Sequence, residues 1–269
     1  MNSISAAKAI LSGSKNPSIR QMSTLWASRV RGPHSWWVPA FKAMYIARND
    51  QALRLILKSI AKGDHGYYTI ADIGRAELIE DMGVSAKRIP PWLLPDSCLQ
   101  RANINPADRS RLRPDTMLVE MTQSESMSYR RHGQRHLELA TTMNSQSRAD
   151  GSSDPQRRKL WLIEGGYTSD TRQAHLQKLA EKQNQRQKLV GALELRGFDV
   201  EPIIFAFGVG GTIYKQSVED LRQLGVSTTS ITKTLTEVHL HSVTCATNII
   251  TQHRIVDSQK LLQTQRQPP

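Results

Sequence analysis

The fold is decided by one stretch of the chain, Leu160-Trp161-Leu162-Ile163-Glu164-Gly165-Gly166. A run of apolar residues leads into a single carboxylate and a glycine pair, which is typical of a buried β-strand closed by a turn. Because a carboxylate is costly to bury without a partner, Glu164 indicates a site at the end of this strand. We therefore expect a strand over residues 160–164 with Glu164 as a functional residue.

Further elements of alternating type lie on both sides of this strand. The apolar spacing predicts helices over 41–61, 75–82, 171–196, 216–224 and 227–253, and strands over 67–71, 116–121 and 200–207. Leu176 is expected within the buried stripe of the helix over 171–196. The strand over 200–207 is almost continuously apolar, so we expect it to be central in the sheet and covered on both faces. Together these elements predict an α/β fold with a mixed sheet of about four strands flanked by helices.

Composition divides the chain into three parts. Residues 1–40 are expected to be a basic, largely irregular extension, residues 41–256 the folded domain, and residues 257–269 a polar tail that frays. Inside the domain, residues 122–158 are rich in polar residues and are expected to form a flexible insertion between two strands. The basic, serine-rich N-terminus reads as an organellar transit peptide, a phosphate-contacting arm or the remnant of an upstream domain.

The charge of the chain indicates its partners. The net charge is +12, the sequence pI is about 10.0 and the mean hydropathy is −0.46. Such an excess favours polyanions, meaning nucleic acid or an anionic membrane surface. No stretch approaches the ~20 apolar residues of a membrane span, so we expect a soluble protein with no membrane partner. Cys98 and Cys245 lie far apart, which excludes a disulfide framework and a four-cysteine zinc site.

A second carboxylate stands where it can meet Glu164. Asp115 begins the strand over 116–121, and in antiparallel neighbours the start of one strand lies beside the end of the other. Two converging carboxylates suit Mg²⁺ (or Mn²⁺), which prefers oxygen ligands and retains several waters. Phosphodiester hydrolysis also needs a cation beside the attacking water. Lys178 and Lys182, four residues apart on one helix face, can supply it.

Several short motifs resemble one family of nucleases. Arg113-Pro114-Asp115, with the strand that follows, resembles the (R/K)-P-D strand of the restriction-like PD-(D/E)XK endonuclease domains that follow the reverse transcriptase in non-LTR retrotransposons. Residues 162–167 are similar to their second acidic strand, residues 207–214 to their glycine turn, and residues 71–74 and 88–96 to the segment before the domain. On the helix, Lys182, Gln185 and Leu189 fit K-x-x-Q-H-x-x-L, with Arg186 where histidine is common. The resemblance spans about residues 42–256.

This resemblance implies a fold, an activity and a set of site residues. The fold is the restriction-endonuclease-like α-β-β-β-α-β core, and the predicted element order agrees with it. The activity is a Mg²⁺- or Mn²⁺-dependent DNA endonuclease that nicks a strand and leaves a 3′-hydroxyl to prime reverse transcription. The implied catalytic residues are Asp115, Glu164 and Lys182, with Asp115 and Glu164 as metal ligands. Nucleic acid, DNA or alternatively RNA, is expected at Arg113, Lys178, Gln185 and Arg186. A nuclear or nucleocytoplasmic location follows, with an organellar one as the alternative.

The chain departs from the family in three respects. Gly166 stands where the fold usually carries its lysine. The zinc knuckle that usually precedes the domain is missing, since His34 has no cysteine partners, and no zinc is expected. No Y-x-D-D polymerase motif occurs, so the reverse transcriptase is expected to be separate or lost. A second hypothesis is therefore a catalytically degenerate nucleic-acid-binding protein that retains the nuclease fold.

Two further patterns receive structural interpretations. The glycine run at Gly208, Gly210 and Gly211 lacks the full GxGxxG pattern, so a tight strand-to-helix turn is favoured over a phosphate cradle. His239 and His241 stand two apart on a predicted helix and point to different faces, which argues against a shared metal.

Overall fold

A four-stranded mixed sheet forms the centre of the protein. The computed structural model describes residues 38–61, 66–73, 86–132, 142–143 and 156–265. The strands are β1 (Tyr67–Ala71), β2 (Thr116–Glu120), β5 (Lys159–Thr168) and β6 (Asp199–Gly208), in the order β1-β2-β5-β6. β2 runs antiparallel to both of its neighbours, whereas β5 and β6 are parallel. The predicted α/β class, with a mixed sheet flanked by helices, is confirmed. The first 37 residues of the expected extension lie outside the described residues. Residues 38–40 were expected to be irregular, but they belong to the first described helix, which begins at Val38.

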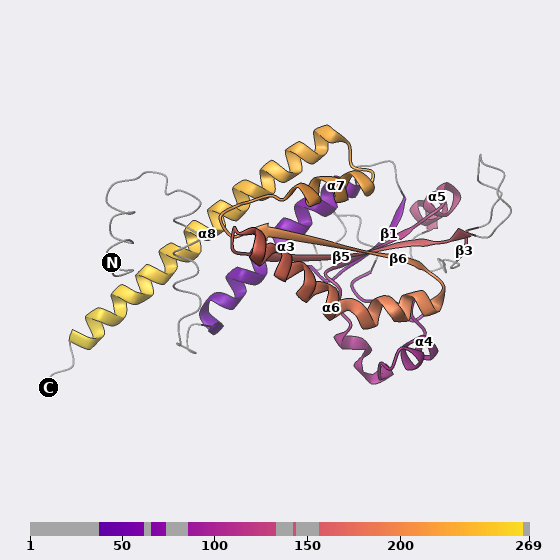
Figure 1. Ribbon diagram of the computed structural model, residues 1–269, viewed down its shortest axis with the longest axis horizontal. Coiled ribbons are helices and arrows are strands. Elements are labelled where there is room, and N and C mark those ends of the chain that lie inside the picture. The colour runs from indigo at the N-terminus through magenta and orange to yellow at the C-terminus, as the bar shows by residue number, and fades with distance from the viewer. Residues whose placement is uncertain (1–37, 62–65, 74–85, 133–141, 144–155, 266–269) are drawn as a thin grey trace.

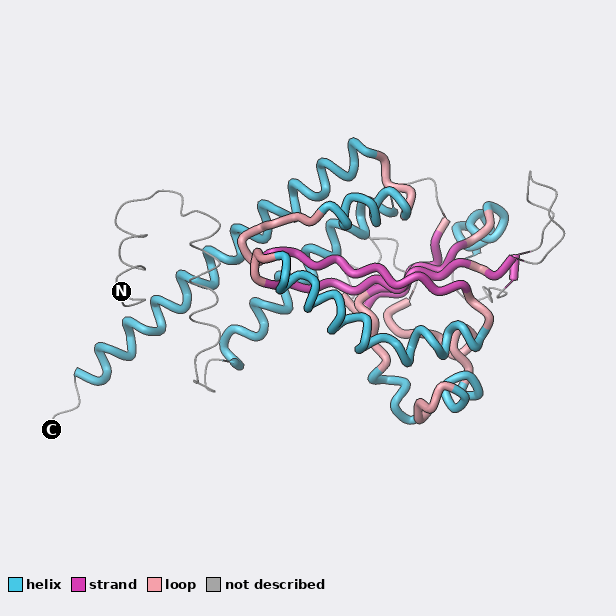
Figure 2. Tube along the Cα trace, viewed as in Figure 1, coloured by secondary structure: helices cyan, strands magenta, loops and turns pink. Residues whose placement is uncertain are grey.

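Helices cover both faces of the sheet (Figure 1). One layer contains α3 (Val38–Ala61), α7 (Lys215–Gln223) and α8 (Thr228–Gln265). The opposite layer contains α4 (Asp96–Arg101) and α6 (Arg172–Arg196). Figure 2 shows the sheet between these layers. The remaining described elements are the 3₁₀ helix η4 (Pro106–Arg111), helix α5 (Gln123–His132), and the paired two-residue strands β3 (Thr142–Met143) and β4 (Gln156–Arg157).

The alternation of side chains along β5 separates two hydrophobic cores. Trp161 and Ile163 face α3 and α8, while Leu160 and Leu162 face α4 and α6. Since successive side chains on a strand point to opposite faces, Glu164 belongs with Leu160 and Leu162 on the α6 side. The same period places Asp115, just before β2, on the side of Met117 and Val119. Both carboxylates therefore face α6.

β5 is longer than the sequence predicts. The expected end at Gly165 and Gly166 is wrong, because both glycines pair with β6 and the strand continues to Thr168. Glu164 thus lies within the strand and not at its end. The glycines answer a packing need: a Cβ at Gly165 would lie 3.0 Å from Leu53 of α3. At this position glycine allows close approach of a helix and does not signal a turn.

β6 lies at the edge of the described sheet, so its predicted central position is wrong. Its apolar run has a different cause. Ile203, Phe205 and Phe207 pack against the α3, α7 and α8 layer, whereas Ile204 faces the opposite side. A continuous apolar strand indicates that both faces are covered and does not require a strand on each edge.

The long helices differ from their predictions in detail. α6 begins after Thr171, whose side chain accepts a hydrogen bond from the Ala174 N–H, and ends at Gly197 with φ 108°. Leu176 was expected in its buried stripe, but 54% of this side chain is exposed. α8 continues past Asp257, where a frayed tail was expected, as far as Gln265. None of the helices in the described ranges is long and apolar enough to cross a membrane.

The expected insertion contains ordered elements where it is described. Helix α5 occupies the first part of the insertion. Arg158, the last residue of the insertion and the residue before β5, is buried. The Arg158 guanidinium donates to the Glu120 carbonyl oxygen at 2.6 Å and pairs with Glu125 of α5 at 2.8 Å. Residues 133–141 and 144–155 lie outside the described residues, as does the short helix expected around 75–82.

Candidate active site

Asp115 and Glu164 meet across the β2–β5 pair. The antiparallel register places Thr116 opposite Ile163, so Asp115 comes opposite Glu164. The backbone N–H of Asp115 donates to Glu164 Oε1 at 3.4 Å, and the Gly165 N–H donates to Asp115 Oδ2 at 2.8 Å. These two reciprocal bonds fix both carboxylates at the same place on the sheet. The convergence predicted from the sequence is present.

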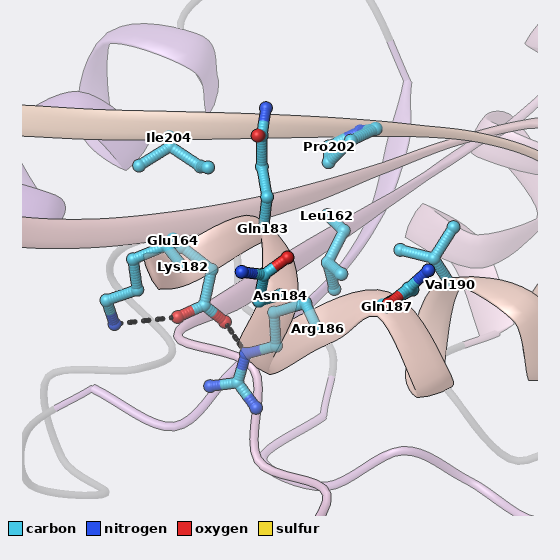
Figure 3. A pocket seen from close by; sticks show the side chains of 10 residues that line it. All are labelled: Leu162, Glu164, Lys182, Gln183, Asn184, Arg186, Gln187, Val190, Pro202 and Ile204. Carbon is cyan, nitrogen blue, oxygen red and sulfur yellow. Dashed lines mark hydrogen bonds and ion pairs between the residues drawn. The ribbon is translucent and has the colours of Figure 1, made fainter. Parts of the chain in front are cut away.

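Helix α6 brings two cations to Glu164 (Figure 3). Lys182 Nζ lies 3.0 Å from Glu164 Oε2 and 3.9 Å from Asp115 Oδ2. Arg186 Nε lies 2.5 Å from Glu164 Oε1, and Arg186 Nη2 donates to the Arg113 carbonyl oxygen at 2.9 Å. The positively charged Lys182 ammonium therefore lies within 4 Å of both carboxylates.

The cluster is buried on the α6 side of the sheet. Glu164 is 1% exposed, and the side chains of Lys182 and Arg186 are 15% and 13% exposed. The sheet-facing side of α6 carries Lys178, Lys182 and Arg186 at four-residue intervals, where an amphipathic helix normally carries apolar residues. Buried charges persist when they are paired and hydrogen-bonded. The basic face of α6 and the carboxylates of the sheet meet that condition together.

The pKa of the Asp115 carboxyl is raised above its ordinary value. Burial, which penalises the charged form, is the main cause, and repulsion from Glu164 adds to it. The Gly165 N–H, Lys182 and Arg186 act in the opposite direction. The surroundings of Asp115 therefore compensate the charge of its ionised form incompletely. An additional cation would relieve this penalty.

Asp115→Asn is expected to raise the free energy of unfolding near neutral pH. Because the folded pKa is raised, the penalty is absent below the ordinary aspartate pKa of about 3.9 and grows as pH rises through the folded pKa. The gain should therefore shrink as pH falls from about 7 toward 4. Urea unfolding of both proteins across this range measures it. A variant less stable than wild type near pH 7 would contradict the sign.

Lysine side chains of α6 occupy the space beside Gly166. A Cβ at Gly166 would lie 3.1 Å from Lys178 Cε and 3.8 Å from Lys182 Cε. The space into which a side chain at position 166 would project is thus filled by the two α6 lysines. Their ammonium groups diverge, since Lys178 pairs with Glu181 and Lys182 with the carboxylate cluster.

The other residues expected to contact nucleic acid differ from one another in exposure and in their partners within the protein. Arg113 is half exposed and pairs with Asp72 at 3.5 Å. Gln185 is exposed on α6, away from the cluster. Arg186, expected to touch nucleic acid, is held by Glu164 and the Arg113 carbonyl. Sequence reasoning missed this role, although the four-residue spacing from Lys182 places Arg186 on the same helix face.

A basic hollow adjoins the chain just before Asp115. Its volume is about 110 Å³, and Pro114 forms part of its wall. Four cationic residues line it: Lys87, Arg88, Arg109 and Arg113. Three of these cations are paired with acids: Lys87 and Arg113 with Asp72, and Arg109 with Asp96. Arg88 is in none of these pairs. No periodic pattern in the sequence indicates this hollow, because its residues come from β1, η4 and the segments beside them.

The glycine turn after β6 is a structural turn, as predicted. The Asp170 carboxylate accepts hydrogen bonds from the N–H groups of Gly210 (2.9 Å) and Thr212 (3.3 Å), which a phosphate would otherwise need. Gly211 has φ 93°, and a Cβ there would lie 2.7 Å from His239. His239 and His241 contact the carbonyl oxygens of Gly211 and Arg48 respectively, so they point to different places, as expected.

No protein family, curated protein or solved structure matches this chain. Within the ranges that the structure describes, no group of three or more His, Cys, Asp or Glu side chains could hold a metal ion. A metal at this site would therefore depend on the two carboxylates, with water or substrate oxygens completing its shell.

Proposed function

We propose that the protein is a Mg²⁺- or Mn²⁺-dependent DNA endonuclease that nicks one strand. One observation carries the proposal: Asp115 and Glu164, from adjacent strands, both lie within 4 Å of the Lys182 ammonium. Two carboxylates and one cation in a shared site are the groups that metal-assisted phosphodiester hydrolysis requires. The proposed fold is the restriction-endonuclease-like core. Its α-β-β-β-α-β order is supported by α3, β1, β2, β5, α6 and β6 in sequence.

The carboxylates fit a hard divalent cation. Both offer oxygen atoms, and their mutual repulsion contributes to the raised pKa of Asp115. Asp115 and Glu164 would hold the ion, which when bound supplies Lewis acidity and an acidified water. Lys182 would orient the attacking water and offset charge on the phosphate oxygens. Arg186 would keep Glu164 in place through its two contacts.

The basic hollow supports DNA as the substrate. It lies beside Asp115 in the chain, and its four cations suit backbone phosphates next to the one that is cleaved. The net charge of +12 provides the longer-range attraction. Phosphate contacts of this kind position a duplex without reading its sequence.

A plasmid-nicking assay tests the proposal. Supercoiled DNA incubated with the protein should convert to the open-circular form with Mg²⁺ or Mn²⁺, and should stay supercoiled with EDTA. Conversion that is equal with and without a metal ion would overturn the metal-dependent mechanism. Complete absence of nicking with either ion would leave the second candidate, a nucleic-acid-binding protein that has lost the chemistry.

One observation favours that second candidate. Glu164 is already paired with both Lys182 and Arg186, so its charge is neutralised without a metal. A site that has lost its ion could be stabilised in this way. Under this hypothesis the basic residues bind DNA, and Asp115 and Glu164 no longer take part in a reaction.

DNA affinity is expected to fall steeply with salt under either hypothesis. Each neutralised phosphate contributes about −0.9 to the slope of log K against log salt concentration. Arg88→Ala in the basic hollow should reduce the slope by about 1 and weaken binding to all sequences alike. Lys215→Ala removes the same charge from an exposed position on α7 and serves as the control. Anisotropy titrations between about 50 and 200 mM salt measure both. Equal slopes for the two variants would show that the hollow does not contribute to DNA binding.

A further inference from the structure

A second cavity extends from the carboxylate cluster between α6 and the sheet. Its volume is about 260 Å³, and Glu164, Lys182 and Arg186 close one end. From there it runs along α6 toward Val190 and over the edge strand β6. The charges are confined to the end that it shares with the candidate active site (Figure 3). This end carries two cations, Lys182 and Arg186, against one carboxylate. An anionic group of a ligand would therefore lie at this end, and its uncharged part beyond it.

The uncharged part combines an apolar floor with an amide rim. Leu162, Val190, Pro202 and Ile204 form the floor. Gln183, Asn184 and Gln187 contribute side-chain amides, and Gln183 reaches across the cavity toward β6 (Figure 3). Within the described part of the chain, these three amides make no side-chain hydrogen bond. They are free to donate to and accept from a ligand.

We propose that this cavity binds one unpaired nucleobase next to the phosphodiester bond that is cleaved. The inference rests on the proposed nuclease function and adds the substrate class: a strand with an unstacked base. A base offers flat apolar faces and a hydrogen-bonding edge, which match the floor and the amides. Its phosphate reaches the charged end. Enzymes that act on nucleic acid use such snug pockets for bases taken out of the stack.

The size and polarity of the cavity agree with this ligand. Pockets for drug-sized ligands hold roughly 300–1,000 Å³, so a cavity of about 260 Å³ suits a single ring system. Amide side chains read base edges through paired donors and acceptors. The basic hollow lies on the Arg113 side of Asp115, whereas this cavity lies on the β6 side of Glu164. A DNA strand that extends from the basic hollow to this cavity would place a backbone phosphate in the hollow and a base in the cavity.

Fluorescent oligonucleotides test the base pocket without requiring cleavage. Single-stranded DNA carries one 2-aminopurine at each position in turn, and the Asp115→Asn protein binds it without a metal ion. Emission should rise severalfold at one position, because the floor and rim residues include no aromatic ring to quench an unstacked base. Gln187→Trp in the same background should abolish that rise by filling the cavity. Gln177→Trp places the same ring on an exposed α6 position outside the cavity and should retain it.

The outcomes separate this inference from the nuclease proposal. Binding with no increase in emission at any position overturns the base pocket, whether or not the wild-type protein nicks DNA. An increase that both tryptophan variants retain also overturns it, because the cavity is then not involved. An increase lost only with Gln187→Trp supports the pocket even if the plasmid assay finds no cleavage. Absence of DNA binding overturns both proposals.

Discussion

Replacing Asp115 with asparagine is expected to reduce metal-dependent nicking by about 10³-fold, the effect of several kcal/mol of lost metal-ion stabilisation. The substitution keeps the side-chain shape and an oxygen that can accept from the Gly165 N–H, so the local fold should persist. DNA binding should be unchanged or tighter, because a negative charge beside the phosphate is removed. Plasmid nicking and anisotropy titration on the same preparation measure the two effects.

Asp108→Asn is the matched control. Asp108 lies on η4, is partly exposed, and pairs with Arg111 on the surface. Asp108→Asn changes the net charge by the same amount as Asp115→Asn but lies outside the carboxylate cluster, so nicking should stay near the wild-type rate. Equal loss in both variants would mean that overall charge, and not the site, governs the reaction. Full activity of Asp115→Asn would exclude Asp115 as a metal ligand.

Asp115→Asn is expected to lose nicking activity and to gain stability, and both effects have the same physical cause. Asp115 is held in a place where its charge is penalised by burial and by Glu164. A protein stabilised by removing that charge, yet inactive without it, is what a preorganised metal site predicts. A purely structural Asp115 would give the opposite result, because its removal would cost stability.

The convergence of the two carboxylates could be predicted because it depends on local rules. Asp115 immediately precedes β2, Glu164 belongs to the next strand of the sheet, and antiparallel pairing places them opposite each other. The side-chain period of two then puts both on one face. This result did not require the correct end of β5. Although the strand runs on through Gly165 and Gly166, the pairing at Glu164 is the same.

The edge position of β6 and the role of Arg186 could not be predicted in the same way. Hydrophobicity reports whether a face is covered and carries no information about the neighbouring strand, so Ile203 and Phe205 read alike in a central or an edge strand. The sequence predicts a nucleic-acid contact for Arg186 and no partner within the fold, because helix patterns assign charge to the outer face. Only the partner strand, with Glu164 buried beneath the helix, reverses that assignment.

Lys182→Ala is expected to slow nicking by about 10²-fold, the cost of removing one group that stabilises developing charge. Binding should weaken much less, since this is one contact among many. Stability should be largely retained, because Arg186 still pairs with Glu164. Single-turnover nicking rates and DNA affinity, measured together, separate the two effects.

A second substitution in the same background tests whether a lysine on β5 can take over the role of Lys182 on α6. In Lys182→Ala, Gly166→Lys should restore most of the lost rate, because a Cβ at position 166 points into the space beside the Lys182 stem. The nearest obstacle, Lys178 Cε at 3.1 Å, belongs to a flexible side chain. Gly191→Lys adds the same charge farther along α6, where a Cβ has open space, and should restore nothing. Equal rescue by Gly166→Lys and Gly191→Lys would mean that the nicking rate depends on net charge and not on the position of the lysine. Absence of rescue in a folded Gly166→Lys protein would mean that a lysine at position 166 cannot take over the role of Lys182.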